Sequence, residues 1–141
     1  GNGLGKSHIA EAALRDLAGR GERARWESVV DLLSRLRSCY SSGQDADDLL
    51  RRVWSTPWLV LDDLGREKAT SDWVQEKLYL VLDHRYNWCK QTILTTNLQP
   101  GDGGQGALTL VDYLGSRLAS RILSMCRIEE LAGGDRRLEE K

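Results

Sequence analysis

The sequence predicts an α/β fold in layers, built around a mainly parallel sheet. Helical and strand-like stretches alternate along the chain, and no internal repeat or low-complexity tract interrupts them. One stretch, Trp-Leu-Val-Leu at residues 58–61, is continuously apolar and ends in Asp62 and Asp63. Such a run is typical of a parallel strand that helices cover on both faces. With 141 residues, 29% charged and 40% hydrophobic, the chain has the size and balance of one globular domain.

The first half of the chain is predicted to hold two helices, a short strand and a helical turn. Residues 7–17 are apolar and alanine-rich, which favours a helix that Gly19 and Gly21 close. Residues 24–26 are a candidate strand. A second helix follows, because apolar side chains recur at helical spacing, namely Val29, Val30, Leu33, Leu36 and Tyr40. A polar turn region and a short helical turn over residues 49–53 complete this half.

The second half is predicted to alternate strands with long helices. Pro57 stands at the start of the apolar strand, where a missing N–H does least harm. Ser71 and Asp72 can cap a helix whose apolar face comprises Val74, Leu78, Val81 and Leu82. Residues 92–97, Thr-Ile-Leu-Thr-Thr-Asn, are β-branched and strand-like.

The last part of the chain is predicted to hold one helix and one strand. The helix covers residues 110–126, after the glycine-rich loop GDGGQG, and its buried stripe comprises Leu114, Leu118, Ile122 and Met125. Residues 127–131 are a candidate last strand. The expected order is a helix followed by four strand–helix alternations, and the strand that opens such a fold is missing.

Charge and cysteine content exclude several classes of protein. A net charge of −1 creates no overall field that attracts nucleic acid, so any DNA contact must come from a local patch or from several assembled copies. The three cysteines form no C-x-x-C pair, and no spacing between them and His8 or His84 fits a zinc pattern. A reducing, cytoplasmic compartment is therefore expected. No apolar run is long enough to span a membrane.

The opening residues GNGLGKSHIA indicate a phosphate-binding loop. Gly5, Lys6 and Ser7 complete the signature G-x-x-x-x-G-K-[ST], whose leading glycine would lie one residue before Gly1. Glycines let backbone N–H groups turn toward phosphate oxygens, and the following helix adds its positive end. Lys6 would bind the β- and γ-phosphates, and the Ser7 hydroxyl would ligate Mg²⁺. The alternative is an ordinary loop-to-helix junction.

Acidic and amide side chains follow the two strongest strands. Asp62 and Asp63 leave the apolar strand at the edge where a doubly wound sheet binds its ligand. Asp62 would hold the metal through water, and Asp63 would orient or deprotonate an attacking water. Asn97, at the end of the next strand, would hold that water in line. The alternatives are a solvated turn at the two acids and an ordinary turn at Asn97.

Two arginines lie four residues apart in LGSRLASRIL. Arg117 and Arg121 therefore project from one side of the predicted helix. In an assembling ATPase, an arginine supplied by a neighbouring copy can stabilise charge on the transferring phosphate. Alone, the pair is more typical of a solvated or ion-paired helix surface.

These motifs together resemble the AAA+ ATPases of the DnaC/IstB type, which are bacterial and phage helicase loaders and transposition helper ATPases. The resemblance covers nearly the whole chain and includes GNGLGKSHIA, WLVLDDLG, SDWVQEKLYLVLDHRYN, TILTTNL and LGSRLASRI in order. It implies Walker A at Gly3, Leu4, Gly5, Lys6 and Ser7, and Walker B at Asp62 and Asp63. It further implies sensor 1 at Asn97 and an arginine finger at Arg121 with Arg117 beside it. Arg137, in the closing GGDRR, is implied as a further nucleotide or DNA contact.

The resemblance implies a function as well as a fold. Residues 1–141 are expected to form a single three-layer P-loop NTPase core that begins inside Walker A, without the family's first strand or its N-terminal partner-binding region. ATP and Mg²⁺ are the implied cofactors. The implied activity is ATP hydrolysis that loads a replicative helicase onto single-stranded DNA, with self-association into a ring or filament. Because the arginine finger acts in trans, a monomer is expected to hydrolyse ATP slowly.

Three other functions remain open at this point. A transposition helper ATPase of the IstB type would have a similar core. A nucleotide-gated binding module with little hydrolysis is also possible, since Asp63 is one methylene shorter than the glutamate common in AAA+ enzymes. An α/β domain without nucleotide chemistry requires four coincident motifs. The sequence does not locate DNA: Arg35, Arg37, Arg66, Lys68 and Lys90 are expected to be solvated, and the five tryptophans to pack in the core.

Overall fold

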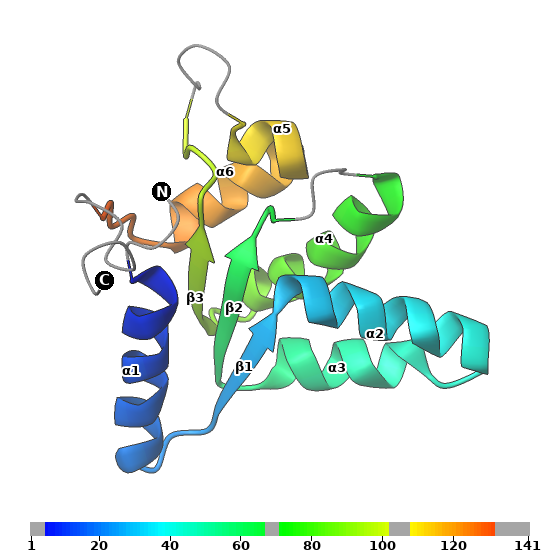
Figure 1. Cartoon of the computed structure of the whole chain (residues 1–141), viewed down its shortest axis with the longest axis horizontal. Coiled ribbons are helices and arrows are strands. Elements are labelled where there is room, and N and C mark those ends of the chain that lie inside the picture. Colours follow the sequence, from blue (N-terminus) through cyan, green and yellow to red (C-terminus); the bar gives the residue numbers. More distant parts are fainter. Residues whose placement is uncertain (1–4, 67–70, 102–107, 132–141) are drawn as a thin grey trace, which may run out of the picture.

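A computed structural model describes residues 5–66, 71–101 and 108–131 of the chain (Figure 1). The elements, in chain order, are α1 (Lys6–Gly19), β1 (Ala24–Ser28), α2 (Val29–Ser42), α3 (Ala46–Ser55), β2 (Trp58–Leu64), α4 (Asp72–Asn87), β3 (Gln91–Thr96), α5 (Leu110–Leu114) and α6 (Ser116–Met125). Helices and strands alternate through most of the chain, as the sequence pattern predicts.

The described strands form one parallel sheet in the order β1-β2-β3. Trp26 pairs with Val60, and Val60 pairs with Ile93, so these three side chains share one face of the sheet. Helix α1 contacts all three strands on one side of the sheet, and α2 to α6 lie on the other (Figure 1). Three layers result, which confirms the predicted α/β class.

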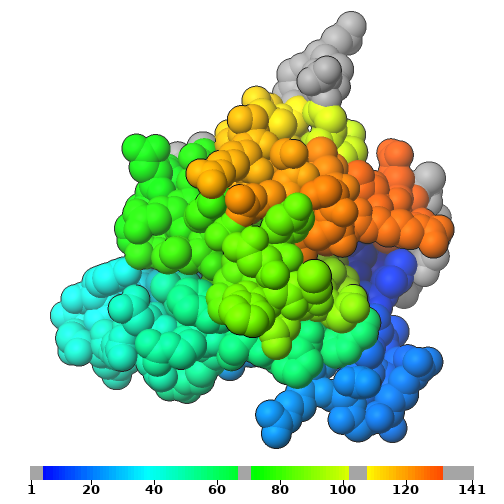
Figure 2. Space-filling model, turned by 180° about the vertical axis from the view of Figure 1, so that it is seen from behind, coloured from blue at the N-terminus to red at the C-terminus, as the bar shows by residue number. Residues whose placement is uncertain are grey.

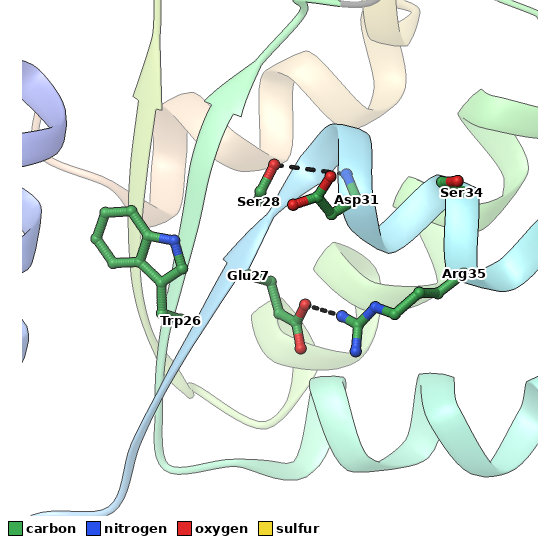
Figure 3. Close-up of a pocket in the computed structure, with 6 residues that line it drawn as sticks. All are labelled: Trp26, Glu27, Ser28, Asp31, Ser34 and Arg35. Atoms are coloured by element: carbon green, nitrogen blue, oxygen red, sulfur yellow. Dashed lines mark hydrogen bonds and ion pairs between the residues drawn. The ribbon is translucent and has the colours of Figure 1, made fainter.

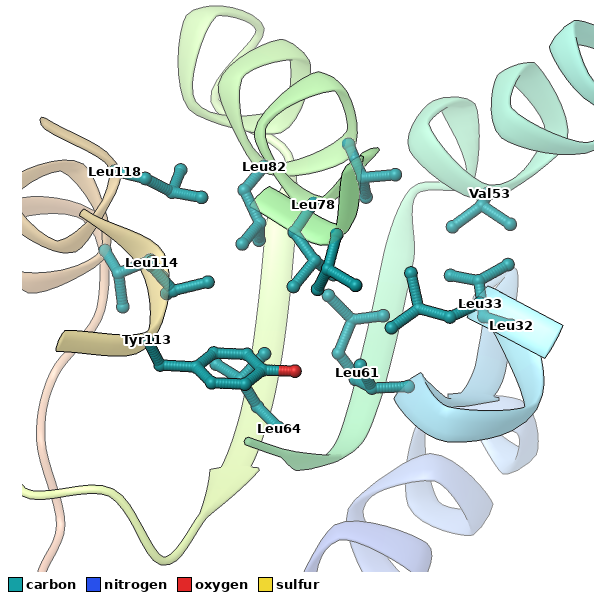
Figure 4. Close-up of a cluster of buried hydrophobic side chains, with 14 of the residues drawn as sticks. Leu32, Leu33, Val53, Leu61, Leu64, Leu78, Leu82, Tyr113, Leu114 and Leu118 are labelled. Carbon is teal, nitrogen blue, oxygen red and sulfur yellow. The ribbon is translucent and has the colours of Figure 1, made fainter. Parts of the chain in front are cut away.

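The main core lies between the sheet and helices α2 to α6. Leu59 and Leu61 of β2 belong to this core, whereas Val60, between them, is equally buried on the α1 side. Both faces of β2 are thus covered, which explains its continuous apolar sequence. Figure 4 shows leucines from the sheet and from several helices in one cluster, with Tyr113 at one side of it beside Leu64 and Leu114. This packing fixes the carboxyl ends of β2 and β3 relative to each other.

Polar side chains define where most of the helices begin. Ser28, Asp45 and Ser71 accept hydrogen bonds from backbone N–H groups in the first turns of α2, α3 and α4. The cap at Ser71 and the buried face of α4 are as predicted. Thr109 and Asp112 form a capping box at α5, and hydrogen bonding from Thr109, chiefly from its backbone N–H, lowers the pKa of the Asp112 carboxyl.

The structure corrects four predictions about the elements. Residues 110–126 form two helices instead of one, because Gly115 interrupts them with φ 85° and ψ 157°. Residues 127–131 form no strand, so the described sheet has three strands and the predicted fourth alternation is wrong. The predicted turn over residues 49–53 is part of the longer α3. In α2, Cys39 is buried and Tyr40 is 54% exposed, so the buried stripe ends at a different residue than predicted.

Arg85 of α4 is fully buried, which the sequence analysis did not anticipate. Its guanidinium donates hydrogen bonds to the Thr92 hydroxyl and to the backbone carbonyls of Trp54, Thr56, Pro57 and Gln91. These acceptors end α3 and begin β2 and β3, so a single side chain holds three elements together. Burial lowers the pKa of Arg85 to about 10, which still leaves the guanidinium charged at neutral pH.

Membrane-spanning helices, metal-binding clusters and disulfides are absent from the described residues. None of the described helices is long and apolar enough to cross a membrane. Within the same part of the chain, no cluster of three or more histidine, cysteine, aspartate or glutamate side chains is placed to hold a metal ion. Cys39, Cys89 and Cys126 are free thiols, and burial raises the pKa of Cys126.

Candidate nucleotide site

The candidate site lies at the carboxyl edge of the parallel sheet. There the first turn of α1 meets the ends of β2 and β3 (Figure 1). Parallel α/β sheets place their ligands at this edge, because the strands end there and the following loops diverge. Lys6, Ser7, Asp62, Asp63 and Asn97 all belong to this edge.

Ser7 and Asp62 are in direct contact. The Ser7 hydroxyl donates a 2.8 Å hydrogen bond to Asp62 Oδ1, across 55 residues of sequence. The Thr95 hydroxyl donates a 2.6 Å bond to the same oxygen from β3. Thr95 is 7% exposed, so Asp62 is held from the interior of the sheet as well as from α1. The structure thus brings together the two side chains predicted to hold a metal.

A β-bulge carries the two acids. Leu61 pairs with Leu94 and Leu64 pairs with Thr96, so Asp62 and Asp63 together face the single residue Thr95. Leu61 and Leu64 are both buried in the main core although they are three positions apart, which a regular strand does not allow. Asp63 has φ 62°, in the left-handed region. The bulge therefore interrupts the alternation of side chains where the acids stand.

Backbone and side chain of Asp63 face different partners. Its N–H donates a 2.7 Å hydrogen bond to the Thr95 hydroxyl. Its carboxylate forms a 3.3 Å ion pair with Arg66, whose side chain is 75% exposed. An exposed pair of this kind is screened by water and weak, so it leaves the Asp63 carboxylate available to other groups at the edge of the sheet.

The loop after β2 packs tightly on the segment after β3. The Thr96 hydroxyl donates a 2.6 Å bond to the Leu64 carbonyl and accepts one of 3.1 Å from the Leu98 N–H. Gly65 has φ 87°, and a Cβ added to it would lie 2.6 Å from Leu98 Cδ1, so a larger residue would be strained and would displace the Leu98 side chain. Asn97 is exposed between these contacts. Its position is thus set by its neighbours on both sides.

Helix α1 begins differently from α2 to α5. Gly5 precedes it with φ 82°, no side chain caps it, and its first turn holds no acidic residue. Uncapped N–H groups and the helix dipole together favour an anion at this end. Gly3 and Leu4, predicted to line the same loop, lie outside the described residues, and Arg137 does as well.

Arg117 and Arg121 lie on α6 and face α4 instead of the site. Arg121 forms an ion pair with Asp83, and its guanidinium lies 5.5 Å from the ring centroid of Tyr79 and 5.3 Å from that of Tyr86. Arg117 lies 5.4 Å from the Tyr79 ring. Figure 2 shows α6, in orange, beside α4, in green, on the back of the molecule. Within one copy, neither arginine is among the contacts of Ser7 and Asp62.

The residues present fit Mg²⁺ and a nucleoside triphosphate. Mg²⁺ prefers oxygen ligands and is usually held by one or two carboxylates together with phosphates and waters. Ser7 Oγ and Asp62 Oδ1 offer a hydroxyl and a carboxylate oxygen 2.8 Å apart.

The sequence analysis missed two residues that shape this site. Thr95 lies within the strand-like stretch that it identified, but the contacts of Thr95 depend on the register between β2 and β3. Gly65 follows Walker B in the sequence, and its role becomes visible only where Leu98 approaches. No signal in the sequence alone distinguishes Thr95 from Thr96.

A separate open cavity of about 430 Å³ lies beside the edge strand β1 (Figure 3). It is lined by Trp26, Glu27, Ser28, Asp31, Ser34 and Arg35. Glu27 is 4% exposed and pairs with Arg35 and, at 2.6 Å, with Arg25. The Glu27 carboxylate is thus already paired with two arginines of its own surroundings and is not available to a ligand.

Comparison with known proteins identifies the family. A family model of IstB-like ATP binding proteins matches residues 1–141. The chain is 31% identical over 96 residues to the uncharacterized protein YdaV of Escherichia coli K12, covering 68% of this chain and 38% of that protein. It is 30% identical over 101 residues to the replicative helicase loader DnaI of Bacillus subtilis, covering 71% of this chain and 32% of DnaI. It is 29% identical over 140 residues to an insertion sequence IS5376 protein of Geobacillus stearothermophilus described as ATP-binding, covering 99% and 53%.

Solved structures agree with this assignment. The crystal structure of the DnaC helicase loader superposes with a TM-score of 0.74 at 35% identity, covering 89% of this chain and 71% of that one. AMPPCP-bound DnaA from Aquifex aeolicus gives a TM-score of 0.72 at 24% identity, covering 87% of this chain and 35% of DnaA, and shows the shared fold. The chain spans between about a third and half of the length of the curated relatives named above. It belongs to the family of IstB-like ATP-binding proteins, within the DnaC/IstB type of AAA+ ATPase.

Proposed function

We propose that this chain binds and hydrolyses ATP and that it loads a replicative helicase onto single-stranded DNA. The observation that carries the ATPase part is the 2.8 Å hydrogen bond between Ser7 Oγ on α1 and Asp62 Oδ1 on β2. P-loop NTPases hold Mg²⁺ between a loop hydroxyl and a Walker B aspartate. The contact supports the same use of these two residues here.

ATP binding is assigned to the start of α1. Lys6 and the backbone N–H groups around Gly5 bind the phosphates, with Gly3 and Leu4 in the same loop. Ser7 and Asp62 hold Mg²⁺, Asp62 through water, and the metal when bound neutralises charge on the phosphates. Arg137 is proposed as a further nucleotide or DNA contact.

Hydrolysis is assigned to groups around the phosphate. Asp63 orients or deprotonates the attacking water, and Asn97 holds that water in line. Arg121 of a neighbouring copy stabilises the charge that develops on the transferring phosphate, with Arg117 beside it. An arginine in this role contributes roughly 10³- to 10⁵-fold to kcat, so the monomer is expected to be slow. This role requires self-association into a ring or filament.

The proposed partners rest on the relatives. DnaI and DnaC are named replicative helicase loaders, and they align with 71% and 67% of this chain. A replicative helicase and single-stranded DNA are therefore the proposed partners.

A transposition helper ATPase is the second candidate, and one observation favours it. The insertion sequence relative aligns with 99% of this chain, more than either loader does. ATP-dependent retention of the replicative helicase on single-stranded DNA would support the loader. ATP-dependent delivery of a transposase to target duplex DNA would support the helper. Nucleotide binding without turnover at high protein concentration would leave a nucleotide-gated module instead.

Nucleotide binding is tested with Lys6→Ala. We expect a fluorescent ATP analogue to bind the purified protein in the presence of Mg²⁺. Removing the ammonium from the phosphates is expected to weaken binding by about tenfold or more. Lys90→Ala, at the opposite edge of the sheet, serves as the matched control and should bind as the unmodified protein does. Equal binding by Lys6→Ala, or none by either well-folded protein, would contradict the ATPase proposal.

A further inference from the structure

We propose that Thr95 is a positioning residue of this site, whose hydroxyl holds both Walker B acids in their working arrangement. This inference rests on the proposed ATP hydrolysis. It concerns a residue of β3 whose hydroxyl contacts both acids from within the sheet.

The Thr95 hydroxyl is fully used by the two acids. It accepts a 2.7 Å hydrogen bond from the Asp63 N–H. Because a backbone N–H can only donate, the hydroxyl hydrogen is free to point at Asp62 Oδ1, which lies 2.6 Å away. Thr95 is 7% exposed, so water has little access to replace either bond. One buried group thus fixes the backbone of one acid and the carboxylate of the other.

The bulge explains why a hydroxyl is needed at this position. Asp62 and Asp63 together face Thr95, so the regular ladder between β2 and β3 is interrupted there. The Asp63 N–H uses the Thr95 side chain as its acceptor, which supports the left-handed conformation of Asp63. A methyl group in place of the hydroxyl would leave this N–H without that acceptor. Serine, which keeps the hydroxyl, can retain both hydrogen bonds.

Thr95 and Ser7 hold Asp62 in different ways. Ser7 is exposed at the start of α1 and is itself a proposed metal ligand. Thr95 is buried in β3 and has no proposed contact with nucleotide. The bond from Thr95 therefore orients Asp62 whether or not Ser7 is engaged elsewhere. Groups that orient a metal ligand in this way typically change metal affinity or activity by about 10- to 100-fold when removed.

Thr95→Val tests this role, because valine has the shape of threonine without the hydroxyl. We expect binding of fluorescent ATP in EDTA to stay within about twofold of the unmodified protein, since Lys6 and the loop are untouched. ATP turnover should fall by about 10- to 100-fold, and the Mg²⁺ concentration for half-maximal turnover should rise. Thr95→Ser should recover most of the ATP turnover and most of the original Mg²⁺ dependence. Thr56→Val, a threonine at the opposite edge of the sheet, should leave the Mg²⁺ dependence unchanged.

Several outcomes would overturn the inference. Unchanged turnover and Mg²⁺ dependence in Thr95→Val would remove any positioning role. An equal loss of ATP binding in EDTA and of ATP turnover would show a general structural defect. If Thr95→Val does not fold, Thr95→Cys replaces it, because a thiol makes weaker hydrogen bonds and should give an intermediate Mg²⁺ dependence. Absence of ATP binding by the unmodified protein would overturn the proposed function and this inference with it.

Discussion

A buried arginine joins several elements at the edge of the sheet opposite the candidate nucleotide site. Arg85 is fully buried, and its hydrogen bonds go to backbone carbonyls and one hydroxyl. Burying a guanidinium is costly, and these bonds offset the cost by satisfying its donors together with carbonyls at the ends of three elements. Its burial lowers its pKa to about 10, which reflects the same desolvation.

We expect Arg85→Met to lower the free energy of unfolding by about 2–4 kcal/mol, because it leaves several buried carbonyls without donors. Arg85→Lys should recover part of this loss, since an ammonium has fewer donors and no planar fork. Urea denaturation measures both variants. Arg51→Met, on the exposed face of α3, is the control and should stay within about 0.5 kcal/mol of the unmodified protein. Equal stability of Arg85→Met would show that the carbonyls find other donors.

At the scale of elements, the break between α5 and α6 sets where the arginine-bearing helix begins. Gly115 has φ 85° and ψ 157°, a conformation open almost only to glycine. A Cβ at this position would meet no atom within 4 Å, so the requirement comes from the backbone and not from crowding. The backbone N–H of Gly115 closes α5 on the Val111 carbonyl, and α6 then starts in a new direction.

Gly115→Ala should therefore destabilise the protein by about 1–3 kcal/mol, although the added methyl group has space. Gly19→Ala is the matched control: its Cβ also meets nothing within 4 Å, but it is the last residue of α1 and has no positive φ. That change should be neutral or slightly stabilising, because alanine favours a helix. Thermal unfolding of both variants checks the difference. A similar shift in both would mean that the backbone at residue 115 relaxes without cost.

Sequence patterns located the elements of the site better than their details. The apolar run before Asp62 predicted β2, because a strand covered on both faces needs apolar side chains at every position. The bulge at Asp62 and Asp63 was not predictable in this way, since it depends on the pairing of β2 with β3. The same is true of Thr95. In the segment 110–126, helical periodicity continued through Gly115 and hid the break, because α5 and α6 bury their apolar residues in the same core.

At the scale of the whole molecule, two groups of predicted site residues lie on different surfaces. Ser7, Asp62 and Asp63 gather at the carboxyl edge of the sheet, whereas Arg121 packs on α4. A finger that acts on another copy must lie away from the site of its own copy, so this separation is what the proposed assembly requires. Arg121, however, is also held within its own copy by Asp83 and two tyrosines. These contacts compete with any role in trans.

Asp83→Asn tests this competition, because it removes the charge that holds Arg121 and keeps the shape of the side chain. If Arg121 acts in trans, ATP turnover of the unmodified protein should rise with protein concentration, and Arg121→Ala should abolish that rise. Asp83→Asn should then increase turnover at a fixed concentration by roughly fivefold, which corresponds to an ion pair worth about 1 kcal/mol. If the ion pair has only a structural role, the outcome differs. Asp83→Asn and Arg121→Ala then both lose stability in urea, ATP turnover does not depend on protein concentration, and Asp83→Asn does not increase turnover. Combining Asp83→Asn with Arg121→Ala separates the two cases, since any gain from releasing the arginine must vanish when the arginine itself is absent.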